Sequence, residues 1–202
     1  MRGKVPLMKS ILLIPILVLL AAGQQTDSRP VILAFGNSLT AGFGVPPPAL
    51  GYPEQLQSRL DANGYKYRVV NTGVSGDTTN GGRARMGRAL LTSPAIVILE
   101  LGGNDRANGL LPSQTQANLE QMIAAFQKAG ASVVLAGRVL PGKDNVFSDL
   151  AGKYHLIWIP DLLAGVAGDP RLTIGDGVHP NADGYAIVVT TVMKAIEPLL
   201  KK

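Results

Sequence analysis

The stretch Val31-Ile32-Leu33-Ala34-Phe35-Gly36-Asn37-Ser38 joins an unbroken apolar run to a polar turn that begins with glycine. An apolar run without polar alternation is typical of a strand that is buried on both faces. Four further runs of this kind follow along the chain, and we expect strands at 31–35, 67–71, 95–101, 131–137 and 156–159. Strands that are buried on both faces indicate a parallel sheet covered by helices on either side.

Segments with helical periodicity lie between these runs. We expect helices over 53–63, 82–91 and 113–129, a shorter one near 144–154, and a last one over 182–200. Asn181 is a suitable N-cap for the last helix, and Gly64 and Gly130 stand where helix C-caps belong. The alternation predicts one α/β domain over 26–202, a three-layer α/β/α fold around a five-stranded parallel sheet.

The composition excludes several classes of protein. A chain of 202 residues is long enough for one domain with its own core, and the absence of cysteine excludes disulfides, thiolate zinc sites and a cysteine nucleophile. The formal net charge is +5, but three positive charges lie within residues 1–23, and the rest of the chain carries +2. Arg83, Arg85 and Arg88 stand at helical spacing, and we interpret them as a solvated helix face. No nucleic-acid partner is expected.

Residues 1–23 have the layout of a secretory signal peptide. Arg2, Lys4 and Lys9 precede an apolar run over 11–22, and small residues end it before polar residues follow. A spanning helix needs about 20 apolar residues, and this run is shorter and contains Pro15. We predict cleavage after Gly23, no membrane span in the mature chain, and export to a bacterial periplasm or to the medium. Retention of the segment as an anchor is the alternative.

Polar, glycine-rich segments follow the first three predicted strands. They read GNSLT at 36–40, TGVSGDTT at 72–79 and GGND at 102–105. The carboxyl ends of parallel strands share one edge of a sheet, so these segments should converge there. Ser38 is either a nucleophile in a tight turn or simply the N-cap of the next helix. Asn104 is either an amide donor to an oxyanion, beside main-chain N–H groups of Ser38 and Gly76, or a turn residue.

The chain has two histidines. His155 stands at the entry to a predicted strand and is interpreted as a structural or surface residue. His179 lies in the loop GDGVHP at 175–180, where the Asp176 carboxylate can reach its Nδ1 and leave Nε2 to accept a proton from a serine. The alternatives are a turn capped by aspartate, or part of a metal site, although the local sequence offers no third ligand. We expect no metal and no cofactor.

Four motifs, GNSL at 36–39, SGDT at 75–78, GGND at 102–105 and DGVHP at 176–180, together resemble the SGNH/GDSL hydrolase family, and in particular its secreted bacterial arylesterase and thioesterase/lysophospholipase members. The resemblance covers nearly all of residues 30–200. It implies a flavodoxin-like fold and metal-free ester hydrolysis. The implied nucleophile is Ser38, the implied triad partners are Asp176 and His179, and the implied oxyanion hole consists of Ser38, Gly76 and Asn104.

The chain departs from the family pattern at two places. Asn37 stands where the family usually has aspartate, which removes a negative charge beside the nucleophile without touching a catalytic role. The segment 140–145 is shorter than its counterpart in relatives, which weakens any inference about substrate.

These observations predict a serine esterase that hydrolyses carboxylic esters or thioesters of short to medium acyl chains through an acyl-enzyme. The substrate is expected to be a small-molecule or lipid ester, and the chain to be a monomer. Phe43, Leu110 and Leu111 follow the first and third loops and could line the acyl site, simple packing against helices being the alternative. Other possible functions are a polysaccharide O-deacetylase or an acyltransferase that uses the same serine, or an impaired relative that binds ligand without turnover.

Overall fold

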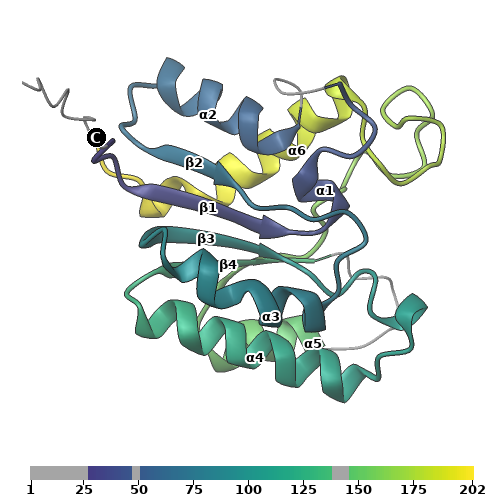
Figure 1. The fold of residues 1–202 in the computed structure, drawn as a ribbon. Coiled ribbons are helices and arrows are strands. Elements are labelled where there is room, and N and C mark those ends of the chain that lie inside the picture. The colour runs from purple at the N-terminus through teal and green to yellow at the C-terminus, as the bar shows by residue number, and fades with distance from the viewer. Residues whose placement is uncertain (1–26, 47–50, 138–145) are drawn as a thin grey trace, which may run out of the picture.

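Five parallel strands in the order β2-β1-β3-β4-β5 form the central layer (Figure 1). The computed structural model describes residues 27–46, 51–137 and 146–202. The predicted five-stranded parallel sheet is therefore confirmed. Its strands are β1 (Val31–Gly36), β2 (Arg68–Asn71), β3 (Pro94–Glu100), β4 (Ser132–Ala136) and β5 (Ile157–Ile159).

Helices cover both faces of the sheet. One face carries α2 (Tyr52–Ala62) and α6 (Ala182–Ile196), and the other carries α3 (Thr79–Leu90), α4 (Pro112–Lys128) and α5 (Val146–Lys153) (Figure 1). The short helix α1 (Ser38–Ala41) follows β1, and two 3-10 turns cover Arg106–Asn108 and Glu197–Leu199. Residues 1–23, the segment 140–145 and the first residues of the helix predicted near 144–154 lie outside the described residues.

Two predicted helices differ clearly from the structure in one of their bounds, and one short helix was not predicted. The helix predicted from 82 begins at Thr79, because the Thr78 side chain accepts a hydrogen bond from the Gly81 N–H and caps it there. The last helix ends as an α-helix at Ile196, since Pro198 has no N–H to donate, and a 3-10 turn replaces its final residues. Helix α1 has four residues, too few for periodicity to be recognised.

Side chains along each central strand alternate between two apolar cores. Ile32 and Ala34 of β1 pack into the core beneath α2 and α6, whereas Leu33 and Phe35 pack into the core beneath α3, α4 and α5. Each strand thus meets a helix layer on either face, which explains why the sequence runs are apolar without interruption. Among residues 27–46, 51–137 and 146–202, no helix is both long and apolar enough to cross a membrane.

The parallel arrangement brings the polar loops to one edge of the sheet. Gly36, the last residue of β1, is paired in register with Glu100, the last residue of β3. In Figure 1 the arrowheads of the strands point toward α1 and the loops that follow β1 and β3. The loops after β1, β2 and β3 therefore start from neighbouring points, as predicted.

Candidate active site

The turn after β1 presents Ser38 as the first residue of α1. The cap of this helix is Asn37, whose side-chain Oδ1 accepts a hydrogen bond from the Leu39 N–H at 3.0 Å. The alternative in which Ser38 merely caps the helix is therefore wrong, and the hydroxyl is available for another partner. A side chain at Gly36 would collide with Thr40 and with Glu100, so the turn can approach β3 this closely only with glycine.

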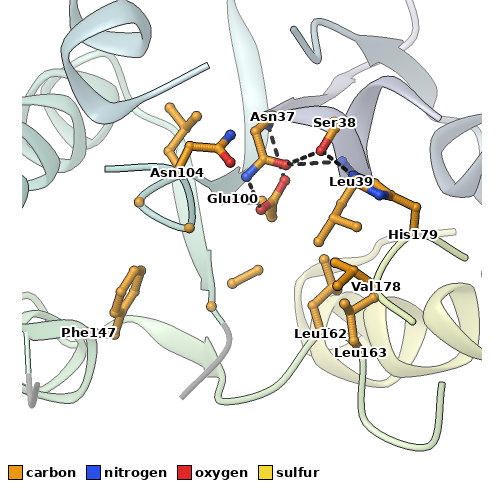
Figure 2. A pocket seen from close by; sticks show the side chains of 15 residues that line it. Asn37, Ser38, Leu39, Glu100, Asn104, Phe147, Leu162, Leu163, Val178 and His179 are labelled. Carbon is orange, nitrogen blue, oxygen red and sulfur yellow. Dashed lines mark hydrogen bonds between the residues drawn. The ribbon is translucent and has the colours of Figure 1, made fainter. Parts of the chain in front are cut away.

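The loop after β5 brings His179 to this serine. The Nε2 atom of His179 lies 2.9 Å from Ser38 Oγ, and its Nδ1 lies 2.5 Å from Asp176 Oδ2 (Figure 2 shows the Ser38–His179 contact). The backbone N–H groups of Val178 and His179 each donate to Asp176 Oδ1 at 2.9 Å, which holds the carboxylate under the imidazole. The hydrogen bond from His179 is the main reason why the pKa of Asp176 falls to about 2.

The loops after β2 and β3 hold the two remaining residues of the predicted oxyanion hole next to each other. Gly76 has a φ of +80°, in the left-handed region that favours glycine. The side-chain Nδ2 of Asn104 donates to the main-chain oxygen of Asp77 at 2.9 Å, which places this amide beside the residue that follows Gly76. The adjacent Asp105 is buried and accepts hydrogen bonds from Thr79 and Thr115, so the loop is anchored on α3 and α4.

A buried carboxylate lies beneath the nucleophile turn. Glu100 is 6% exposed, and its Oε1 accepts a hydrogen bond from Asn37 Nδ2 at 2.7 Å (Figure 2). Its Oε2 accepts from the Asn37 N–H at 3.1 Å and from the Thr40 hydroxyl at 3.0 Å. Burial raises the pKa of Glu100 to about 7 although these bonds oppose the rise. The sequence analysis missed Glu100; the available signal was an acidic residue that ends an otherwise apolar strand.

A cavity of about 320 Å³ lies beside Ser38 and His179. Asn104 and Phe147 line one side of it, and Val178, Leu162 and Leu163 line the other (Figure 2). It therefore offers hydrogen-bond donors next to an apolar wall, as a site for an ester with a hydrocarbon part requires.

The three residues predicted to contact substrate occupy two different places. The Phe43 ring is 49% exposed and lies 4.9 Å from the His179 ring, measured between centroids. Leu110 and Leu111 line an adjoining cavity of about 470 Å³, which shares Gly102 and Phe147 with the cavity beside Ser38. The structure thus places Phe43 at the histidine and the two leucines farther along the surface.

One prediction about charged residues is wrong. Arg83 and Arg88 are exposed, as a solvated helix face requires, but the Arg85 guanidinium turns inward and bonds to three residues of two segments at the sheet edge. His155 is exposed, in agreement with its interpretation as a surface residue. Within the described part of the chain, no group of three or more acidic or histidine side chains could hold a metal ion.

A serine, a histidine and an aspartate are in contact at the carboxyl ends of the strands of a three-layer parallel fold, an arrangement that fits a hydrolase. The chain belongs to the GDSL-like Lipase/Acylhydrolase family, which it matches over residues 34–187. The resemblance noted in the sequence is therefore confirmed, and the protein is an esterase of this type.

Relatives with similar sequences and a similar solved structure agree with this assignment. The chain is 35% identical over 203 residues to Esterase TesA of Pseudomonas aeruginosa, covering 96% of this chain and 100% of that protein. It is 30% identical over 198 residues to Thioesterase 1/protease 1/lysophospholipase L1 of Escherichia coli, covering 93% of each. A crystal structure of TesA superimposes with a TM-score of 0.77 at 35% identity, over 84% of this chain and 99% of that chain.

Proposed function

We propose that the protein hydrolyses carboxylic esters and thioesters by an acyl-enzyme mechanism, with Ser38 as nucleophile and His179 and Asp176 as its triad partners. The observation that carries this proposal is the chain of contacts from Ser38 Oγ to His179 Nε2 at 2.9 Å and from His179 Nδ1 to Asp176 at 2.5 Å. Asp176 fixes the tautomer in which Nε2 is the acceptor and stabilises the imidazolium once it forms.

In the first half of the reaction, Ser38 Oγ attacks the ester carbonyl carbon while His179 Nε2 takes the hydroxyl proton. The carbonyl oxygen becomes an oxyanion, which the N–H groups of Ser38 and Gly76 and the Asn104 amide stabilise. Collapse of this intermediate breaks the bond to the leaving oxygen or sulfur, which receives the proton from His179. Water then repeats the sequence on the acyl-enzyme and releases the acid.

This mechanism determines where the leaving group and the acyl part of the substrate lie in the site. The leaving atom must lie within hydrogen-bond reach of His179 Nε2, so the group attached to it lies beside Phe43, whose ring packs on the imidazole. The acyl part then occupies the cavity of about 320 Å³, which adjoins the cavity of Leu110 and Leu111 at Gly102 and Phe147. This size supports short to medium acyl chains, and longer chains would extend toward Leu110 and Leu111.

A matched pair of variants tests this assignment of the leaving group and the acyl part. Phe43→Ala is expected to raise KM about 2- to 10-fold for aryl esters, because it removes an aromatic contact, and to change KM much less for ethyl esters of the same acid. Leu111→Ala is expected to leave this leaving-group preference unchanged and to alter the dependence on acyl-chain length. A Phe43 variant that instead shifts the chain-length optimum would contradict the assignment.

Two simple variants and a covalent probe test the mechanism itself. Ser38→Ala is expected to leave only residual hydrolysis of a short aryl ester, whereas Asn104→Ala should lose about 100- to 1,000-fold in kcat, since one oxyanion donor of three is missing. An alkyl phosphonate should label the wild type at Ser38 and leave Ser38→Ala unlabelled. Full activity of both variants, or labelling elsewhere, would refute the mechanism.

We further propose that residues 1–23 direct export and are removed, and that the mature esterase acts as a monomer in a periplasm or in the medium. The basic start and short apolar run of this segment support export. Mass spectrometry of the protein recovered from outside the cytoplasm should show an N-terminus at Gln24. A full-length protein in the membrane fraction would show that the segment is retained.

A further inference from the structure

Arg85 of α3 connects the end of β1 with two points of the loop that follows β2. Its Nη2 donates to the main-chain oxygen of Gly36 at 3.0 Å, and its Nη1 donates to that of Thr72 at 2.6 Å. Its Nε donates to the Asp77 carboxylate at 2.8 Å. Gly36 ends β1, whereas Thr72 and Asp77 lie at the start and near the end of the loop after β2, which also contains Gly76. The guanidinium, which also lies 4.0 Å from the centre of the Phe35 ring, therefore uses donors on all three nitrogens.

The ion pair between Arg85 and Asp77 is partly buried. The Asp77 side chain is 8% exposed and that of Arg85 is 23% exposed. A side chain at Gly81, in the first turn of α3, would collide with the Asp77 carboxylate and displace it from this position. A partly buried pair with this geometry is screened much less by solvent than a surface pair, and loss of one partner leaves the other charge uncompensated.

Asp77 in turn adjoins both loop donors of the oxyanion hole. It directly follows Gly76, and its N–H donates to the Val74 oxygen at 3.0 Å, which closes the turn containing Gly76. Its main-chain oxygen accepts one hydrogen of the Asn104 amide at 2.9 Å. Because an amide NH₂ has two hydrogens, this bond orients the second one for another acceptor, and Asn104 lines the cavity beside Ser38.

We propose that Arg85 is a positioning residue for the oxyanion hole of the esterase. By bonding to Gly36, Thr72 and Asp77, it sets the spacing between the turn of Ser38 and the loop of Gly76, and through Asp77 it fixes the Asn104 amide. Its positive charge also compensates the Asp77 carboxylate, which would otherwise oppose the negative charge that develops on the substrate oxygen. The proposal rests on the acyl-transfer mechanism above and adds a residue that touches neither the substrate nor the triad.

The test compares Arg85→Ala and Arg85→Lys with Arg83→Ala, an exposed arginine on the same helix, and counts active sites by phosphonate titration. Arg85→Ala is expected to lower kcat per titrated site about 10- to 100-fold, less than the loss of a whole donor, with KM changed less than about threefold. Arg85→Lys should recover part of the loss, because an ammonium can pair with Asp77 but cannot reach both carbonyls. Arg83→Ala should match the wild type.

A double variant and a transition-state analogue separate positioning from a purely structural role. Arg85→Ala combined with Asp77→Asn should be no slower than Arg85→Ala alone, because the proposal has the Asp77 carboxylate act through its contact with Arg85. A boronic acid, whose tetrahedral adduct places an oxygen in the oxyanion hole, should bind Arg85→Ala more weakly by the factor lost in kcat/KM. Losses that multiply in the double variant, or an unchanged kcat per titrated site, would overturn the proposal.

A wrong proposed function and a wrong role for Arg85 give different experimental results. If the wild type hydrolyses no ester, the acyl-transfer mechanism fails, and the placement of Asn104 by Arg85 is then judged by nuclear magnetic resonance. The side-chain NH₂ signals of Asn104 should shift in Arg85→Ala and stay unchanged in Arg83→Ala. Unchanged signals in both variants would show that Arg85 does not position this amide.

Discussion

The buried carboxylate of Glu100 should make the stability of the protein depend on pH in a defined direction. Its pKa of about 7 in the folded protein exceeds the ordinary value of 4.5 because burial disfavours the charged form. The folded state therefore binds a proton more tightly than the unfolded state between these values. This contribution to stability is fully present below pH 4.5 and is lost as the pH rises through about 7.

The expected size of this loss of stability follows from the two pKa values of Glu100. The interval between 4.5 and about 7, at about 1.4 kcal/mol per pH unit, corresponds to a loss of about 3 kcal/mol in the free energy of unfolding. Glu100→Gln removes the titrating group and keeps its volume. It also places the NH₂ group of glutamine opposite a donor of Asn37, and this mismatch costs about 1–3 kcal/mol, the same at every pH. The stability of the wild type minus that of the variant should thus fall by about 3 kcal/mol across the interval, which brings it to zero or makes it negative.

Urea unfolding at pH values from 4.5 to 8, followed by the fluorescence of Trp158, the single tryptophan, measures this difference. Other titrating groups contribute to both proteins alike, so they cancel in the comparison. The difference should level off about one pH unit above this pKa of about 7, where Glu100 is ionised in both states. A difference that stays constant within about 0.5 kcal/mol over the whole range would refute the assignment of a raised pKa to this buried group.

Three further predictions concern the same loops. Asn37→Asp places a second carboxylate 2.7 Å from Glu100, so the pair should hold one proton to a higher pH, and the loss of stability should extend beyond that of the wild type in the same urea titration. Asp176→Asn should lower kcat about 10⁴-fold at pH 7 in an aryl-ester assay, because an amide at this position favours the wrong imidazole tautomer; a loss below tenfold would argue against the triad. Gly73→Ala forces a methyl group into the backbone of Ala41, and thermal unfolding should show a destabilisation of about 1–3 kcal/mol, whereas unchanged stability would mean that the two loops are not in close contact.

The arrangement of the fold could be predicted from local patterns in the sequence. Unbroken apolar runs are required of strands such as β1, whose successive side chains enter cores on opposite faces. Strand ends in a parallel sheet share one edge, so the motifs that contain Ser38, Gly76 and Asn104 were expected at one place. Asp176 and His179 are three residues apart, a separation over which a loop can bring them into contact without help from the rest of the fold.

Contacts between distant segments were decided by the tertiary structure alone. The sequence grouped Arg85 with Arg83 and Arg88 as a solvated helix face, but local spacing carries no information on which side chain finds carbonyl acceptors from other loops. Glu100 is a buried acid whose hydrogen-bond donors, Asn37 and Thr40, lie 63 and 60 residues away in the sequence. Phe43 likewise meets His179, and not Leu110 or Leu111, through the path of the chain in space. A local pattern specifies which face of an element is apolar, whereas the energy of a buried charge or a shared hydrogen bond depends on groups that only folding brings within about 3 Å.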